Sequence, residues 1–505
     1  MLQYTSCIVG VFMFLFLANP MARLRFLLTL VRYSIVLSSS MHRTMPIMAP
    51  VVLAPEIIHN IIYFLTHDYL VPIDDESWGV IRGCGRYAAV SRTWQDEIER
   101  ETFASLRLDL DGLLQANFIV TPRRRRFVRT IKLDVALPMS GPVGSPETDE
   151  EKLRNNCSLQ VTFEAFLRLM GSWEATDVHQ AGVKLYVDTS MPDDAFNRRP
   201  VTPQSRKRQA KLERRRASSL VELTDPDRIA QYPPVIAITE YKGNSSDLNI
   251  HISAAATCVL LAKLPAVKGA FIDWWRYHLS ISDSSLTYGD WFPFNPPPAS
   301  STQEVDELSI SIRNMSQRLK KLDIYDISIS DELFFPRTPS LDMMPIWDRL
   351  AMLSLHYLPV THSGEWLFLP DPDASSSSEE EPDSDDSSSR DGWPSEEPQP
   401  KPSIAAPAMQ QFYLAAAHAA LQMPALKQMK LIALLESGIC WHKFWYHSEE
   451  MMARALWTSS SGFVPDEEVL DRWRMVPRKH IEIDLEVEIS EDENALESLD
   501  DENVV

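Results

Sequence analysis

Apolar residues after Leu53 recur at the spacing of one buried helical face. They are Ile57, Ile58, Ile61, Ile62 and Leu65, and Pro55 and Glu56 suit the first turn of such a helix. The pattern predicts a second helix from about residue 86 to residue 102. Its buried face would consist of Tyr87, Val90, Trp94, Ile98 and Phe103, and its outer face of Gln95, Asp96, Glu97, Glu99 and Arg100. The folded part of the chain is therefore expected to begin with a short helical module.

Further along the chain, a triplet of apolar residues with the spacing Φ-x-x-Φ-x-Φ recurs. It begins at Phe103, Val128, Leu319, Leu350 and Leu426, and a related segment runs from Leu264 to Trp275. Neighbouring triplets at intervals of roughly 25 to 31 residues match the period of leucine-rich units, which pair one short strand with one helix. An α/β chain can also produce such triplets by chance, so this interpretation stays open.

Helical segments are predicted between these strands, at residues 161–174 and 408–423, and residues 481–489 alternate as a strand does. The expected fold class is therefore α+β or α/β, with a short helical module followed by an irregular leucine-rich-like strand–helix solenoid. The predicted divisions are an apolar leader or mispredicted extension (1–48), the helical module (49–102), the α/β body (103–370, with a basic linker at 198–217), a disordered Ser/acidic insert (371–404), a continuation of the body (405–489) and an acidic tail (490–505).

Charge is distributed unevenly along the 505 residues, whose formal net charge is −21. Residues 371–400 hold eleven acids and one base, and residues 481–505 hold eleven acids and no base, so these two segments account for the whole excess. A Ser-rich, acidic stretch with so few apolar residues cannot bury enough apolar surface to fold. The acidity therefore belongs to an insert and a tail, and it indicates little about the folded body.

Candidate chemistry is sparse. The five cysteines show no disulfide or CxxC spacing, which favours a reducing compartment. Gly83, Gly85 and Ala88 fit a dinucleotide-loop pattern but lack a preceding buried strand, and we interpret them as a loop that enters a helix. Cys440, His442 and His447 could suggest a metal site, yet the aromatic residues among them favour packing. No nucleophile, P-loop or metalloprotease motif occurs. We therefore expect no enzyme activity, no metal, no cofactor and no small-molecule substrate.

Two basic runs and an apolar leader remain. The arginines at 123–126 could grip phosphates, but nearby acids can neutralise them, which favours a solvated loop or a partner contact over nucleic acid. The basic run at 205–216 is read as a linker or as a nuclear-import signal. Residues 8–37 are strongly apolar, so a membrane-associated protein stays an alternative, while later starts at Met41, Met45 or Met48 would remove this segment.

The helical module resembles an F-box. The resemblance is carried by Leu53, Pro55, Glu56, Ile57, Ile61 and Leu65 in the first helix, and by Val90, Ser91, Arg92 and Trp94 in the second. The continuation from "ERETFASLRLDL" to "RRRRFVRTIKLDVALP" is similar to fungal F-box-like proteins whose body has no assigned activity. This resemblance implies that the module docks to the adaptor of the SCF-type cullin–RING ubiquitin ligases. The implied docking face is Pro55, Ile57, Ile58, Ile61 and Leu65, although the same residues would also serve as plain core.

These observations lead to one expected function and two alternatives. The expectation is a non-catalytic substrate receptor that docks to the ligase adaptor and cullin and presents an unknown protein target for ubiquitination, in the cytoplasm, the nucleus or both. The first alternative is a protein-interaction scaffold without a ligase role. The second is a membrane-anchored protein that uses residues 8–37.

Overall fold

The chain forms two compact units. The computed structural model describes residues 58, 88–138, 147–174, 176–177, 179–190, 220–243, 251–273, 306–328, 330–336, 345–358, 361, 367–369, 403–404, 406–434, 441–460 and 462–492. The first unit, here called the helical unit, comprises Met1–Leu106 with Pro122–Val128, and the second, the sheet unit, comprises Arg107–Thr121 with Arg129–Val505.

The described elements alternate between strands and helices. The strands of the main sheet are β1 (Ser105–Leu108), β2 (Thr130–Ala136), β3 (Val183–Ser190), β5 (Ile238–Gly243), β7 (Gly269–Asp273), β8 (Lys321–Ile327), β9 (Met352–Tyr357), β12 (Gln428–Leu434), β13 (Trp441–Glu449), β14 (Met452–Ser459) and β15 (Glu486–Ser490). Two short pairs stand apart, namely β4 (Leu220–Val221) with β6 (His251–Ile252) and β10 (Phe368–Leu369) with β11 (Ser403–Ile404).

The helical unit contains α4 (Arg92–Ala104) and α6 (Pro122–Arg125). The helices of the sheet unit are α5 (Leu110–Ile119), α7 (Asp149–Met170), α9 (Pro226–Ala230), α10 (Ala254–Ala262), α11 (Glu307–Ser316), α12 (Ala406–Ala420) and α13 (Glu467–His480), with a 3-10 turn η5 (Asp331–Leu333).

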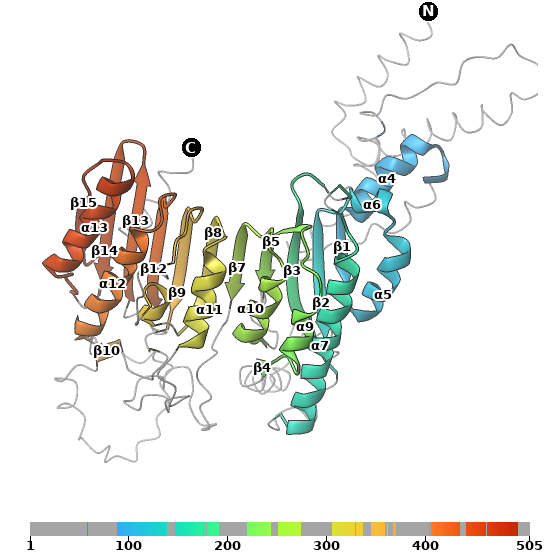
Figure 1. Cartoon of the computed structure of the whole chain (residues 1–505), viewed down its shortest axis with the longest axis horizontal. Helices are drawn as coiled ribbons and strands as arrows, with labels where there is room; N and C mark the ends of the chain where they lie inside the picture. The colour runs from blue at the N-terminus through green and yellow to red at the C-terminus, as the bar shows by residue number, and fades with distance from the viewer. Residues whose placement is uncertain are drawn as a thin grey trace, which may run out of the picture. The chain divides into compact units, whose positions relative to one another are not determined.

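The main sheet follows the order of the chain from β1 to β15, as the colour gradient in Figure 1 shows. The strands from β2 to β12 pair in parallel with their neighbours. The chain then turns back twice, because β13 is antiparallel to both β12 and β14, and β15 returns parallel to β14. The mixed α/β class is thus confirmed, with one large and mostly parallel sheet.

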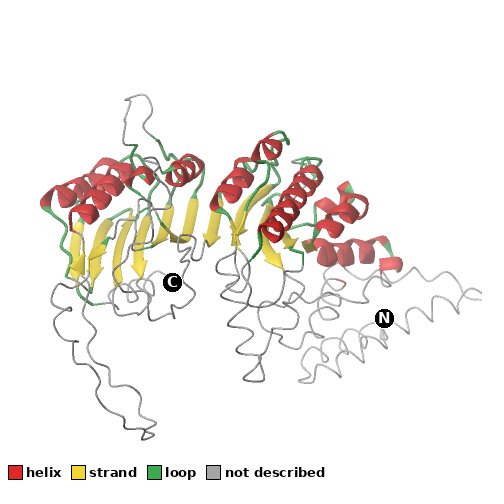
Figure 2. Ribbon diagram, turned by 90° about the horizontal axis from the view of Figure 1, so that it is seen from below, coloured by secondary structure: helices red, strands yellow, loops and turns green. Residues whose placement is uncertain are grey.

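The described helices of the sheet unit lie along one face of this sheet (Figure 2). The cause is topological. A crossover between parallel strands is right-handed, and when each crossover leads to the next strand in the same direction, every connecting helix arrives on the same face. The opposite face carries no helix among the described residues of this unit.

The apolar triplets of the sequence lie on strands. The residues at their second and third positions are buried toward the helices, and they include Ile131 and Leu133 on β2, and Leu322 and Ile324 on β8. The triplets that begin at Leu350 and Leu426 fall on β9 and β12 in the same way. The triplet that begins at Phe103 falls on β1, where Leu108 is buried and Leu106 is half-buried. Strands β3 and β5 carry no such triplet, and the pattern did not predict them.

The predicted helices are present with shifted ends. The segment 161–174 is the second half of α7, which begins earlier because Thr148 and Glu151 form a capping box. Ser91 accepts a hydrogen bond from the backbone of Trp94, so α4 begins at Arg92 instead of residue 86, and Val90 is 48% exposed. Glu97 and Glu99 are buried, although they were expected on the outer face.

Several expectations lie outside the described residues. These are the leader at 1–48, the first helix apart from Ile58, the basic linker at 198–217, most of the insert at 371–404 and the last residues of the tail. The last two residues of the predicted insert, Ser403 and Ile404, form strand β11. Within the described ranges, no helix combines the length and the apolar character needed to span a bilayer.

An aromatic core closes the C-terminal end of the sheet. Phe444 on β13 lies 4.6 Å from both Trp457 on β14 and Trp473 on α13, measured between ring centroids. Tyr413 on α12 reaches into the same core, and its hydroxyl is 2.6 Å from Nε2 of His442. Burial lowers the pKa of His442 to about 3, so its imidazole is neutral in the folded protein at neutral pH.

This buried histidine predicts a loss of stability in mild acid. The unfolded chain takes up a proton at His442 near pH 6.5, whereas the folded chain does so only near its lowered pKa of about 3. Stability from this group is therefore full above pH 6.5 and declines as the pH falls below it. Between pH 7 and pH 5 the free energy of unfolding should fall by about 2 kcal/mol more in the wild type than in His442→Gln, measured by urea unfolding.

The matched control is His179→Gln, because His179 is exposed. It should keep the pH dependence of the wild type. If His442→Gln keeps it as well, the imidazole of His442 does not resist protonation in the folded state.

Candidate functional site

The implied adaptor-docking face is described at one position. Ile58 is helical and 3% exposed, whereas Pro55, Ile57, Ile61 and Leu65 lie outside the described residues. Trp94, which was expected on the buried face of the second helix, is also buried. Both side chains occupy core positions.

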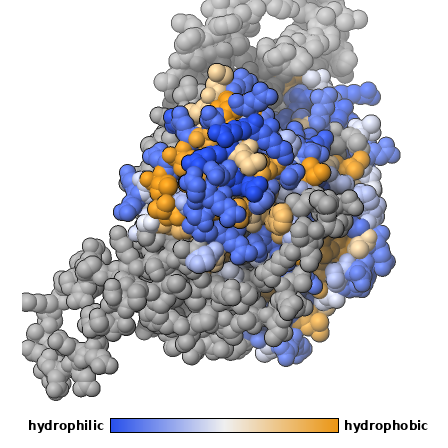
Figure 3. Space-filling view, turned by 60° about the vertical axis from the view of Figure 1, so that its left-hand side comes forward, coloured by the Kyte–Doolittle hydropathy of each residue, from blue (hydrophilic) through white to orange (hydrophobic). Residues whose placement is uncertain are grey.

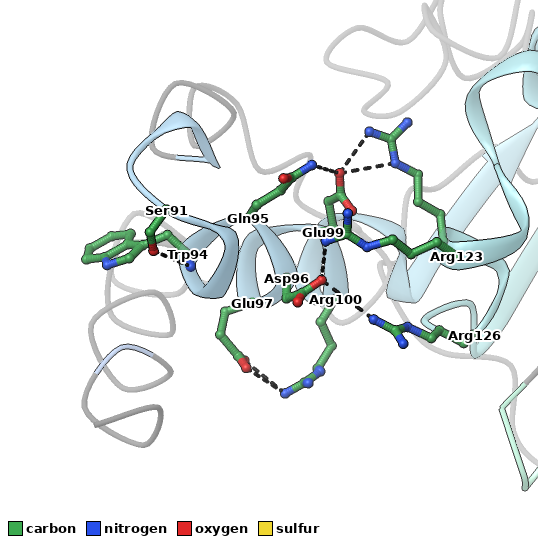
Figure 4. Close-up of polar contacts among 10 residues, drawn as sticks. Ser91, Trp94, Gln95, Asp96, Glu97, Glu99, Arg100, Arg123 and Arg126 are labelled. Carbon is green, nitrogen blue, oxygen red and sulfur yellow. Dashed lines mark hydrogen bonds and ion pairs between the residues drawn. The ribbon is translucent and has the colours of Figure 1, made fainter. Parts of the chain in front are cut away.

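The arginines that follow α5 pair with the acids of α4 inside the helical unit (Figure 4). Arg123 is hydrogen-bonded to Asp96, and Arg126 lies 3.6 Å from the same carboxylate. Arg124 binds Glu99 at 2.8 Å. Burial raises the pKa of Glu99, but hydrogen bonds from Arg124 and Gln95 outweigh it and hold that pKa below its usual value. Arg123, Arg124 and Arg126 are thus occupied by carboxylates of their own unit.

The sheet face that carries no described helix is here called the helix-free face. Its polar and aromatic side chains form rows, because residues paired across neighbouring strands lie side by side. Along each strand they alternate with the apolar residues that face the helices. One row crosses seven strands through Lys132, Tyr186, Lys242, Phe271, Asp323, Ser354 and Lys430. The face is therefore continuous from β2 to β12 and combines both signs of charge with aromatic rings.

Ion pairs organise the first strands of this face. Asp134 and Asp188 lie opposite each other on β2 and β3, and both are buried. Two like charges side by side are unfavourable unless each has a cation. Arg107 lies 2.6 Å from Asp134, and Lys132 lies 3.1 Å from Asp188. Each of the two neighbouring carboxylates thus has a cation beside it.

Three rings line up in the middle of the face. Lys242 sits 4.8 Å above the ring of Phe271, which is 5.1 Å from Tyr325. Tyr325 in turn stacks on His356 at 4.1 Å. These residues lie on β5, β7, β8 and β9, and they place three neighbouring rings beside a cation.

The charges around Phe271, Tyr325 and His356 differ between the two ends of this series of rings. Burial raises the pKa of Tyr325, and the carboxylates of Asp323 and Asp273 add to the effect. Burial lowers the pKa of His356 to about 4, and Lys430 and Lys443 lower it further. At neutral pH the imidazole of His356 is therefore neutral. The carboxylates of Asp323 and Asp273 lie near Tyr325, and the lysines 430 and 443 lie near His356. Such a surface can bind and orient a ligand.

The two histidines of the predicted cluster on β13 point in opposite directions. His442 contacts Tyr413 on the helix side, whereas His447 stacks on Trp445 and lies 3.1 Å from Glu449. Their spacing of five residues along a strand places them on opposite faces, so they cannot converge on one ion. Cys440 lies outside the described residues, and within the described ranges no group of three ligating side chains could hold a metal.

Sequence reasoning missed the row of Phe271, Tyr325 and His356. These residues stand at the variable positions of the apolar pattern, one step from the buried residues Ile272, Ile324 and Leu355. The available signal was strand alternation, which places such positions on the opposite face. Their proximity across three strands depends on register, which sequence spacing does not give.

Lys132 is predicted to stabilise the fold through the paired acids. Lys132→Met leaves the Asp188 side chain, 6% exposed, without its nearest cation and beside Asp134. We expect the free energy of unfolding to fall by about 2 kcal/mol, measured by urea unfolding at neutral pH.

Lys184→Met is the matched control on the next strand. Lys184 pairs with Glu240 at 2.7 Å, but both side chains are half exposed, so the loss should stay below about 1 kcal/mol. Equal losses in the two variants would contradict the role given to burial.

Comparisons with known proteins identify one segment. Residues 398–502 match the model of a family described as a family of unknown function (DUF6546). No curated protein and no solved structure matches the chain. The matched segment holds α12, β12 to β14, α13 and β15, which is the end of the sheet that closes on the aromatic core.

Proposed function

We propose that this protein is a non-catalytic receptor that holds a protein target on the helix-free face of its sheet. The observation that carries the proposal is the continuous row of polar and aromatic side chains across β2 to β12. A face with paired charges and exposed parts of rings offers hydrogen bonds, ion pairs and stacking to a partner surface.

The body is proposed to be an irregular leucine-rich-like solenoid. Its strands follow chain order, its crossovers run in one direction, and its buried apolar triplets recur from strand to strand. Stacked strand–helix units of this kind suit binding because they present an extended surface on a stable frame.

The ligase connection is proposed from the resemblance of the module to an F-box. The buried Ile58 and Trp94 and the Ser91 cap of α4 suit a small helical module. A module of about 50 residues buries too little surface to be strongly stable alone, so an adaptor helix would complete its apolar face. On this proposal the protein works in the cytoplasm, the nucleus or both. Ubiquitin transfer takes place on other subunits, and this chain positions the target.

One observation favours the scaffold alternative. The ion pairs from Arg123, Arg124 and Arg126 to Asp96 and Glu99 tie α4 to a later segment of its own chain. In this alternative the helical module is a fixed part of the fold and has no adaptor. The membrane-anchored alternative depends on residues 8–37, which lie outside the described residues.

The adaptor connection is tested by co-purification. Residues 45–505, tagged and expressed in the native cells, should recover the ligase adaptor and cullin. Ile57→Asp and Ile61→Asp should each lower the adaptor recovered at least about tenfold, because a charge cannot enter an apolar helix interface.

The matched control is Ile236→Asp in the sheet unit, where the isoleucine is 47% exposed. It should leave adaptor recovery unchanged. Circular dichroism separates loss of binding from loss of fold. A folded wild-type chain that recovers no adaptor, under conditions where an authentic F-box protein does, rules out the ligase role and leaves the scaffold.

A further inference from the structure

The last strand of the sheet offers an edge for pairing. Among the described strands, β15 stands at the end of the order and pairs only with β14 (Figure 1). Every second residue of an edge strand directs its backbone N–H and C=O groups away from the sheet, where another strand can bind them. Among the described strands, none pairs with the outer edge of β15.

The two sides of β15 differ in chemistry. Glu486 and Glu488 are exposed on the helix-free side, where Glu486 pairs with Arg454 at 2.9 Å. Val487 and Ile489 face the helix side, in register with Ala455 and Trp457. Ile489 is 42% exposed, since no described helix follows β15 to cover it.

The surface at this end of the sheet mixes both kinds of residue. Figure 3 turns the end with α13 and β15 forward and shows hydrophobic residues interspersed among hydrophilic ones. A strand that continued the sheet would extend both sides at once. Its side chains next to Ile489 would bury apolar area, and those next to Glu488 would meet negative charge.

The charges argue against a second copy as the occupant. Two β15 strands paired antiparallel would place Glu486 and Glu488 of one chain against those of the other on the same side. Like charges directly opposite each other destabilise a strand pair. A strand with lysine or arginine at alternate positions would pair favourably, because each base then lies beside a glutamate of β15.

We propose that β15 is a docking edge for an extended segment of another protein in which basic and apolar residues alternate. The segment adds one strand to the sheet, with its basic side chains beside Glu486 and Glu488 and its apolar side chains beside Val487 and Ile489. Backbone hydrogen bonds give the affinity for the added strand, and its alternating basic and apolar side chains give the specificity. This inference is independent of the ligase role, and either can fail without the other.

The test uses the full chain and a labelled peptide of alternating lysine and valine, followed by fluorescence anisotropy. The wild-type chain should bind the peptide saturably. A peptide with the same side chains but N-methylated at every second residue loses the N–H groups of one edge, and its affinity should fall at least about tenfold. Glu488→Lys should weaken binding of the unmodified peptide at least about threefold.

The controls separate docking from bulk attraction, since the chain carries a formal net charge of −21. Glu450→Lys makes the same charge change in the exposed turn between β13 and β14, and it should alter the affinity by less than about twofold. Equal affinity for the N-methylated peptide, equal losses in Glu450→Lys and Glu488→Lys, or no binding by the wild type would each overturn the proposal. Thermal unfolding confirms that both variants stay folded.

Discussion

The architecture of the sheet unit depends on one constraint, which is that every parallel connection from β2 to β12 leads to the next strand in the same direction. Right-handed crossovers repeated in one direction put all connecting helices on one face. A sheet whose strand order reverses would carry helices on both faces and would bury its side chains on both sides. Here only one face needs to be apolar throughout. The other is free to hold charges and rings, and the candidate binding surface is a consequence of this topology.

The two faces impose different requirements on each strand. Toward the helices, Ile131, Leu133 and their counterparts are fully buried, so almost any polar substitution there would leave an unsatisfied group. On the opposite face, polar residues are tolerated where they have partners. Buried Asp188 has Lys132 beside it, and half-buried Tyr325 stacks on His356. The binding surface is thus built from interactions that also contribute to the stability of the sheet.

This division explains what the sequence could predict. The apolar triplets mark strands β1, β2, β8, β9 and β12, because the buried face of a repeated unit leaves a local spacing. The apolar pattern did not predict strand β5, because Tyr241 and Gly243 occupy its buried positions and neither is aliphatic. The proximity of Phe271, Tyr325 and His356 could not be predicted for another reason. These residues lie far apart in sequence, and only the register of three strands makes them neighbours.

The C-terminal end shows how such a sheet can stop. An interior unit of a repeat is covered by the next parallel unit, whereas the described strands after β12 cover their buried side in another way. Here the chain turns back as the hairpins β12 to β14 and packs Phe444, Trp457 and Trp473 into a core of its own. The family match covers this closing segment, residues 398–502, and none of the strands from β1 to β9. On the helix side Ile489 of β15 stays 42% exposed. No other described strand pairs with the outer edge of β15, and charge on Glu486 and Glu488 limits what can pair with it.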